Sequence, residues 1–355
     1  MDFSLLNQEE LQTEGKDFRP EPPPIVAGRH LHIDADFLAY QCGYRWEEES
    51  LQTATENLKV AALTLRIMAG AEHAVLHTTM GDKAGRYQVA RVKEYQALRK
   101  ERPQGLTDRA NDLRNFMANW KEPGVVPSTW TDREADDGIC NAMWEANERG
   151  HQDYHVMWSR DKDLSMVGGL HMDPDTYEIE SFPWGYGSCR IDESTSSKKV
   201  KGAGTSFFWH QMLMGDSADN IPGLPALTPQ LQRERMPTKT YLKARERLNK
   251  AKGAAKIKAA KIALKKLEDN MKPKTIGPVM AHSLLKDCSS DKEAFQVIRE
   301  CYKDYYGARA QVASWDGWLE RRWLGDLILE QARLLWMQRY KGDDVAEWIR
   351  EIHRA

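Results

Sequence analysis

The chain has 355 residues, of which 41% are hydrophobic and 29% are charged. These proportions are typical of a globular protein with a substantial core, and the length allows one large domain or two of ordinary size. With 51 Lys and Arg residues against 53 Asp and Glu residues, the net charge of −2 indicates no partner by itself. The apolar runs are too short to span a bilayer, so we expect no membrane association.

The first 24 residues are polar and end in three consecutive prolines, which predicts a flexible tail at 1–24. This segment has no basic stretch followed by an apolar one, so we expect no secretory signal. Five cysteines occur without a C-x-x-C motif, which argues against a disulfide framework and a thiolate zinc site. A reducing cytoplasm is therefore the expected compartment, and carboxylates are the expected ligands of any metal ion.

Strands and helices are predicted to alternate in the first half of the chain. Apolar runs predict strands at 29–33, 74–79 and 154–159, and helical spacing of apolar residues predicts helices at 54–69 and 132–149. This alternation predicts an α/β fold with a parallel sheet flanked by helices, whose ligands bind beyond the carboxyl ends of the strands. Each of the three strands is followed by an aspartate, namely Asp34, Asp82 and Asp161.

Further acidic clusters occur along the chain, and each alone has an ordinary explanation as the first turn of a helix or a turn after a strand. They contain Asp36, Glu134, Asp136, Asp137, Asp163, Asp216 and Asp219. Two carboxylates 4 Å apart repel by about 4 kcal/mol at an effective dielectric of 20, so carboxylates gathered at one sheet edge require cations. Oxygen ligands select Mg²⁺, with Mn²⁺ as a substitute. The number of carboxylates suggests two ions, an arrangement that suits attack of water on a phosphodiester. Asp36 could tune this cluster from behind the ligands.

Two glycine-containing segments predict backbone that closely approaches phosphate. One is the run from Gly215 through Asp216, Asp219 and Asn220 to Gly223, and the other is the Ile-Gly-Pro turn at Gly277. Each is weak alone, because Ile-Gly-Pro is often just a helix start. Their order after the other acidic motifs is the informative feature.

The ordered series of motifs resembles the flap endonuclease/5′→3′ exonuclease family, and phage 5′ exonucleases in particular, over about residues 30–290. The resemblance implies a PIN-like nuclease domain at 25–205 with a helical arch at about 83–130. It also implies a helix-three-turn-helix DNA-binding module at 206–300 and leaves a helical, Trp-rich C-terminal region at 301–355. By position, it implies one Mg²⁺ held by Asp34, Asp82, Glu134 and Asp136, and a second held by Asp161, Asp163 and Asp216, with Asp137 and Asp219 in support. A monovalent cation at the helix-three-turn-helix is a further expectation.

The implied activity is hydrolysis of DNA at duplex 5′ ends and flaps, with RNA–DNA hybrid as a further candidate substrate. We expect a monomer that acts in phage DNA replication, recombination, primer removal or host-DNA breakdown, in the host cytoplasm if a phage encodes it. The carboxylates assigned to the two ions, together with Arg99, are the expected catalytic residues. The expected DNA contacts come from Lys83, Arg86, Arg91, Lys93, Tyr95, Arg99, Lys100, Gly223 and Gly277, with the ring of Tyr95 stacked on a base.

The chain departs from the family pattern at two positions. Gln96 stands where the arch of the family often has a lysine, and Lys83, Lys93 or Lys100 could supply the missing charge. Thr275 stands at the first glycine position of the second helix-three-turn-helix turn. For the arch, the alternative to a strand passage is an exposed charged helix.

A basic insertion at 226–275 interrupts the helix-three-turn-helix. Its 230–275 part has 15 Lys or Arg against 4 Asp or Glu, a net charge of +11 on a remainder of −13. We expect one long helix or a broken pair around Gly253, which acts either as a solvated face or as a sequence-independent phosphate contact.

The C-terminal tryptophans leave a similar choice. Together with Leu319 and Leu327, several of them fall at spacings of three or four, which favours a packed helical core over a base-stacking surface.

Two rival functions remain open. A phosphatase of the haloacid-dehalogenase type would use Asp34 as nucleophile, but it leaves Glu134, Asp136, Asp161 and Asp163 without a role. A catalytically inactive protein that binds DNA structures would not need the complete carboxylate set.

Overall fold

The computed structural model describes residues 21–354, except 195–197, 226–238, 252 and 272–274. The predicted tail at 1–24 therefore lies mostly outside the described residues. A six-stranded sheet forms the first layer, in the order β3-β2-β1-β4-β5-β6, and all neighbouring strands are parallel except β5 and β6. Its strands are β1 (Val26–Asp34), β2 (Ala71–Thr79), β3 (Val125–Trp130), β4 (His155–Trp158), β5 (Gly169–Met172) and β6 (Ile179–Phe182).

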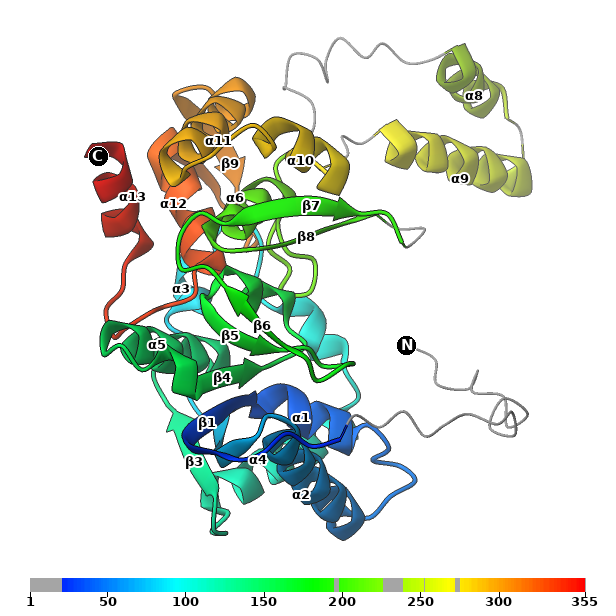
Figure 1. The fold of residues 1–355 in the computed structure, drawn as a ribbon. Helices are drawn as coiled ribbons and strands as arrows, with labels where there is room; N and C mark the ends of the chain where they lie inside the picture. Colours follow the sequence, from blue (N-terminus) through cyan, green and yellow to red (C-terminus); the bar gives the residue numbers. More distant parts are fainter. Residues whose placement is uncertain (1–20, 195–197, 226–238, 252, 272–274, 355) are drawn as a thin grey trace.

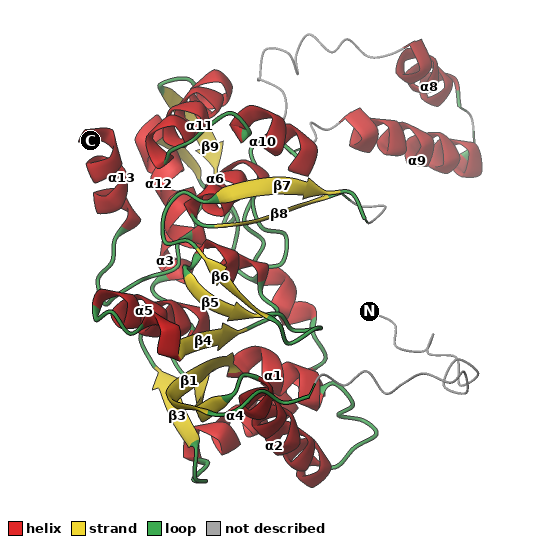
Figure 2. Ribbon diagram, viewed as in Figure 1, coloured by secondary structure: helices red, strands yellow, loops and turns green. Residues whose placement is uncertain are grey.

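Helices cover both faces of this sheet, which confirms the predicted α/β fold (Figures 1 and 2). Side chains alternate along β1, so Leu31 and Ile33 face one side and His32 and Asp34 face the other. The first side packs against α1 (Ala35–Gly43), α2 (Leu51–Met68) and α4 (Gln104–Asn119). The second side packs against α5 (Ala135–Glu148).

Three histidines form a hydrogen-bonded row across the second side. His32 lies 2.9 Å from His77 and 2.8 Å from His155, and Trp130 Nε1 donates to His77 Nδ1 at 3.0 Å. Because an indole can only donate, His77 in turn donates through Nε2 to His32, and His32 donates through Nε2 to His155. Burial lowers the pKa of His77 to about 3, so the row is neutral. Gly138 of α5 packs on Trp130, where a Cβ atom would meet the indole at 2.1 Å.

The predicted arch at about 83–130 differs from the structure in its second half. Residues 83–103 form loops, one turn of helix in α3 (Arg86–Val89) and the 3₁₀ helix η3 (Ala97–Glu101). By contrast, 104–130 supplies α4 and β3, which belong to the α/β layer. Helix α4 packs on the sheet because it has a narrow apolar stripe. The residues of this stripe, Ala110, Leu113 and Met117, are fully buried, although most of the helix is polar.

A second layer contains the C-terminal half of the chain. Its hairpins are β7 (Ser188–Asp192) with β8 (Lys199–Ala203), and β9 (Arg309–Ala313) with β10 (Leu319–Trp323). Its helices are α6 (Thr205–Met214), α10 (Pro278–Leu285), α11 (Asp291–Tyr306), α12 (Leu324–Leu335) and α13 (Val345–Arg354). Two 3₁₀ helices, η4 (Gln152–Tyr154) and η5 (Lys162–Met166), flank strand β4 of the first layer. Its core gathers around Phe208 and Trp209, on which Trp336 and Trp348 pack.

The C-terminal region is therefore helical except for one segment. The tryptophan-rich stretch at 309–323 is a β-hairpin, and its three tryptophans Trp315, Trp318 and Trp323 are exposed. The expectation of a packed helical core holds for Trp336 and Trp348 and is wrong for this segment, because the Asp316-Gly317 turn reverses the chain.

The described part of the basic insertion is a pair of helices, α8 (Lys239–Lys250) and α9 (Ala254–Met271), which pack against each other (Figure 1). Gly253 stands between them with a φ of +91°, a conformation that favours glycine, so the broken pair is confirmed. In the described part of the chain, no helix is apolar over a length that could cross a membrane. All five cysteines are described and free.

Candidate active site

Three carboxylates, those of Asp34, Asp136 and Asp161, lie together at the carboxyl edge of the parallel sheet, and the exposed Asp82 follows a strand of the same edge. Asp34 is the last residue of β1, Asp82 follows β2 and Asp161 follows β4, while Asp136 lies in the first turn of α5. The strands end at a common level because Asp34 pairs in register with His77 and Ile33 with Trp158. The sequence prediction of aspartates from separate strands at one edge is confirmed.

Asp34 and Asp136 are held in an environment that disfavours their charge. Burial and then the charge of Asp36 raise the pKa of Asp34 to about 7. Burial, and then the charges of Asp34 and Asp161, raise the pKa of Asp136 well above its usual range. Asp161 lies at the exposed rim of the cluster. The surrounding protein still removes water from its carboxyl group, and this loss of hydration raises its pKa as well. These shifts show that the three carboxylates interact.

Within the described residues, no Lys or Arg side chain forms an ion pair with Asp34, Asp136 or Asp161. Asp34 instead accepts hydrogen bonds from Phe37 N at 2.9 Å and from Ser159 Oγ at 2.8 Å. Nor do any three His, Cys, Asp or Glu side chains in that part of the chain stand ready to hold a metal ion. Asp34 and Asp136 are thus carboxyl groups that are shielded from water and lack a partner cation among the described residues.

The remaining acidic residues of the edge are neutralised by basic side chains. Lys162 Nζ lies 2.8 Å from Asp163 and 2.7 Å from Asp216, and so bridges two separate acidic motifs. Glu134 lies 2.9 Å from Lys83 and 3.0 Å from Arg86. Burial alone would raise the pKa of Glu134, but these two cations lower it to about 2.

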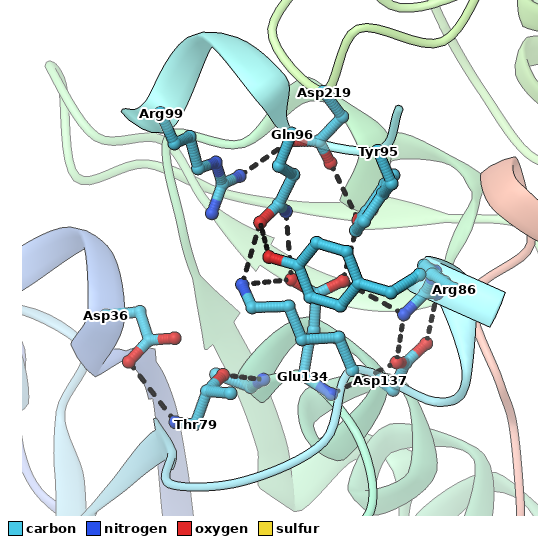
Figure 3. Close-up of polar contacts among 12 residues, drawn as sticks. Asp36, Thr79, Arg86, Tyr95, Gln96, Arg99, Glu134, Asp137 and Asp219 are labelled. Atoms are coloured by element: carbon cyan, nitrogen blue, oxygen red, sulfur yellow. Dashed lines mark hydrogen bonds and ion pairs between the residues drawn. The ribbon is translucent and has the colours of Figure 1, made fainter. Parts of the chain in front are cut away.

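Arg86 and Asp137 form a buried ion pair. Arg86 donates to both oxygens of Asp137, at 2.7 and 2.8 Å (Figure 3). It also donates to the carbonyl of Trp336 at 2.8 Å. Asp137 also accepts from Gln338 N at 3.0 Å. The expectation that Arg86 contacts DNA is wrong for this conformation, because its guanidinium is buried against these partners. Its role here is to tie the 83–103 segment to the C-terminal region.

The 83–103 segment passes over Glu134 and Asp219. The Tyr95 hydroxyl lies 2.8 Å from Glu134 and 3.0 Å from Asp219 and has one proton to donate to this pair, and Arg99 donates to Asp219 at 2.6 Å. The Tyr95 ring is buried and packs edge-on against Tyr87, so the expected stacking of this ring on a base is wrong for this conformation.

Gln96 has a φ of +53°, which is uncommon outside glycine, and its N–H donates to the carbonyl of Asp219 at 2.8 Å. Its side chain meets Lys83 and Glu134 at 2.9 and 3.1 Å (Figure 3). The structure therefore shows which of the candidate lysines lies beside Gln96. Lys83 does so, whereas Lys100 pairs with Glu94 and Lys93 is exposed.

A cavity of about 490 Å³ opens beside the carboxylates. Three cations line it, from the 83–103 segment and from α4, and several polar groups complete its wall. The lining residues are Asp36, Tyr40, Thr79, Met80, Gly81, Lys83, Arg99, Asn111, Arg114 and Asn115. Arg114 is held by Asp36 at 2.7 Å and lies 4.9 Å from the centre of the Tyr40 ring.

Sequence reasoning did not find Arg114, Tyr40 or Lys162. The first two carry no motif, although Asn111 and Arg114 share a helix face at a spacing of three residues, and their side chains are 2.9 Å apart. Lys162 lies inside the Asp-Lys-Asp motif, where its proximity to Asp216 is visible only in the fold.

The other predicted residues are placed as follows. Asp82 is exposed and accepts from Gly85 N, and Arg91 pairs with Glu320 at 3.2 Å.

The two predicted phosphate-binding segments lie side by side, since Leu224 and Ile276 share a backbone hydrogen bond and Pro225 pairs with Thr275. Gly223 packs against Met214, where a Cβ atom would be 2.2 Å from the carbonyl oxygen, and Gly277 precedes α10.

No protein-family model matches the chain, and no curated protein sequence matches it either. Solved structures from bacteriophage T5 do. They include the 5′-exonuclease with bound zinc and the flap endonuclease in a pseudo-enzyme–product complex with DNA and metal ions, each 14% identical with a TM-score of 0.40. A further T5 structure, crystallised with metal ions, is 13% identical with a TM-score of 0.40. Each match covers 78% of this chain and 99% of the T5 chain.

Proposed function

We propose that the protein is a metal-dependent nuclease that hydrolyses phosphodiester bonds at the 5′ ends and flaps of DNA, with a PIN-like nuclease domain. The observation that carries the proposal is the group of Asp34, Asp136 and Asp161, whose pKa values are raised and which have no cationic partner among the described residues. Buried carboxylates of this kind are costly unless a cation joins them. Donor sets made only of oxygen favour Mg²⁺ or Mn²⁺.

The residues that would hold the metal ions are those given by the motifs. Asp34, Asp136 and Asp161 have the free carboxylates, and Asp82, Glu134, Asp163 and Asp216 surround them. Lys162 occupies the last two in this conformation, but its side chain is 54% exposed and can move away. When bound, divalent ions lower the pKa of the attacking water and stabilise the leaving oxygen, which would leave a 5′-phosphate product.

The cationic cavity is suited to hold the DNA strand. Each of its three cationic side chains, those of Lys83, Arg99 and Arg114, forms an ion pair with one acidic residue. The ion pair fixes the position of the ammonium or guanidinium group and leaves its other N–H donors for a phosphate. Asn111 and Asn115 add donors that tolerate either a phosphate or a sugar. We infer that these residues orient the strand so that one phosphodiester lies against the carboxylates.

Beyond the site, α8 and α9 expose a set of cationic side chains to which a duplex backbone could bind without sequence preference. They include Lys243, Arg245, Arg247, Lys250, Lys256, Lys258, Lys261 and Lys265. A role in phage replication, recombination or primer removal follows from the family resemblance of the motifs and belongs to the same proposal.

The decisive experiment uses 5′-labelled and 3′-labelled flap, blunt and RNA–DNA hybrid substrates, with Mg²⁺ or with EDTA. We expect short labelled products from the 5′ end with Mg²⁺ and none with EDTA. Asp34→Ala and Asp161→Ala should abolish cleavage while DNA binding persists. Full Mg²⁺-dependent activity in both variants would contradict the metal assignment. Flap binding without any cleavage would favour an inactive binder, and a phosphoaspartate trapped on Asp34 would favour the phosphatase.

A further inference from the structure

The β9–β10 hairpin exposes an aromatic and basic face. Because side chains alternate along the two strands, one face is exposed throughout while Ala310, Val312, Glu320 and Arg322 point to the half-buried side. The exposed face consists of three cross-strand pairs, which are Trp323 with Arg309, Arg321 with Gln311, and Leu319 with Ala313. This face has no acidic residue.

Three indoles of the hairpin and its turn are open to solvent to an unusual degree. Trp315 is 51% exposed, Trp323 is 56% exposed and Trp318, next to the turn glycine, is 72% exposed. The guanidinium of Arg309 lies 4.3 Å from the centre of the Trp323 ring. Indole surface in water is unfavourable, so three exposed indoles on one hairpin mark a binding surface. The turn carries one exposed carboxylate, Asp316, but the exposed face of the two strands combines the Trp323 ring with Arg309 and Arg321, as on surfaces on which nucleic-acid bases stack.

The hairpin is anchored to the 83–103 segment. Trp315 donates from its backbone N–H to the carbonyl of Arg91 at 2.9 Å and from Nε1 to the carbonyl of Ala90 at 3.1 Å. Glu330 of α12 accepts from the backbone N–H groups of Arg91 and Val92, both at 2.9 Å. This segment continues within a few residues to Gln96 and Arg99 at the site. The exposed face is therefore physically joined to the wall of the cationic cavity.

We propose that the exposed face of the β9–β10 hairpin, with Trp318 at its turn, binds the single-stranded part of a DNA substrate. Bases stack on Trp318 and Trp323, and Arg309 and Arg321 contact phosphates. Duplex DNA is a poor occupant, because its bases are already stacked on one another. The proposal rests on the proposed nuclease function, which would bring a 5′ single strand to the neighbouring 83–103 segment.

The test compares the double variant Trp318→Ala/Trp323→Ala with the wild type, by fluorescence anisotropy of labelled DNA in EDTA. One probe is a blunt duplex, and the other is the same duplex with a 5′ single-stranded tail of about 20 nucleotides, long enough to cover a binding site of the usual size. We expect the double variant to bind the tailed probe at least about tenfold more weakly and the blunt probe equally well, since stacking on each aromatic ring contributes about fivefold or more. Equal binding of the tailed probe, or equal losses on both probes, would overturn the proposal.

Two control proteins accompany this comparison. Trp318→Phe/Trp323→Phe keeps aromatic rings and should retain most of the tailed-probe affinity. Tyr154→Ala removes a 47% exposed aromatic residue at the opposite, amino-terminal end of β4, and should have no effect. If the wild type cleaves DNA but the double variant binds normally, only the hairpin proposal fails. If the wild type cleaves nothing while the selective binding loss is seen, the nuclease proposal fails and the single-strand site stands.

Discussion

The side chain of Gln96 holds the ammonium group of Lys83, which donates to Gln96 Oε1 at 2.9 Å and lies 2.9 Å from Glu134 Oε1. Residue 96 is the position at which the resembled family often has a lysine. The loop after β2 thus brings a lysine from elsewhere in the chain to the side chain of residue 96. Lys83 thus places an ammonium group beside the side chain of residue 96, and both residues lie at the same cavity or its rim.

Lys83→Met is therefore expected to lower the rate of DNA cleavage by about 10²-fold, the usual effect of removing one preorganised donor to a developing charge. Lys83→Met/Gln96→Lys should recover part of that rate, because it returns an ammonium group to the same place. Lys303→Met is the control, since its exposed side chain pairs with Glu300 away from the cavity lining, and it should cleave within about twofold of the wild type. Single-turnover cleavage of a flap substrate measures all three, and an unimpaired Lys83→Met variant would contradict this role.

Asp34→Asn should stabilise the metal-free protein at pH 8. The folded protein raises the pKa of Asp34 to about 7, so above pH 7 the wild type holds a buried anion at a cost on the order of 4 kcal/mol. Asparagine keeps the Oδ1 acceptor for Phe37 N without the charge. As pH falls through 7 towards 4, the wild-type carboxyl takes up a proton and the advantage of the variant should shrink. The difference in the free energy of unfolding between the two proteins in EDTA, measured from pH 5 to pH 8, tests this.

The same pair of proteins tests metal binding without reference to activity. A ligand present at about 100 times its dissociation constant stabilises a fold by about 2.7 kcal/mol, so Mg²⁺ or Mn²⁺ should raise the wild-type Tm at pH 8. The rise should be much smaller for Asp34→Asn, which lacks one of the proposed ligands. Equal rises in both proteins would mean that the ions bind elsewhere.

The sheet and its acidic edge could be predicted because their signals are local. Apolar runs end in Asp34 and Asp161, and parallel strands bring such ends together whatever the rest of the chain does. The role of α4 was missed because only Ala110, Leu113 and Met117 mark its buried face within a charged sequence. The β9–β10 hairpin was missed because its tryptophans mimic helical spacing.

The pairing of side chains within the site could not be predicted. Lys83 and Gln96 are 13 residues apart, and Arg86 and Asp137 are 51 residues apart, so their contacts depend on how two segments cross rather than on either sequence. Motif matching treats every acidic residue of a cluster alike. The fold separates them, since Asp137 is enclosed by Arg86 while Asp136, one residue earlier, faces the carboxylates of Asp34 and Asp161.

Arg86→Met should destabilise the protein by about 3–5 kcal/mol, because it leaves the Asp137 carboxylate buried without its partner. Arg86→Met/Asp137→Leu removes both charges and should recover much of this stability. The matched control is Arg149→Met, which breaks an exposed pair with Glu145 and should change stability by less than about 1 kcal/mol. Urea unfolding gives the three free energies. A small effect of Arg86→Met would show that water or another cation reaches Asp137.

The basic insertion can be removed with little disturbance, because Pro225 and Thr275 pair directly as a β-bridge. We expect a variant in which a short glycine-rich turn replaces 226–274 to fold with an unchanged Tm, and to bind duplex DNA more weakly. Removing one cation that binds a phosphate reduces the slope of log affinity against log salt by about 0.9. Replacing Lys256, Lys258, Lys261 and Lys265 of α9 with glutamine tests the charge alone and should reduce the slope by up to about 3.6. Slopes equal to that of the wild type in both variants would place the DNA away from α8 and α9, and would leave these helices as a solvated charged face.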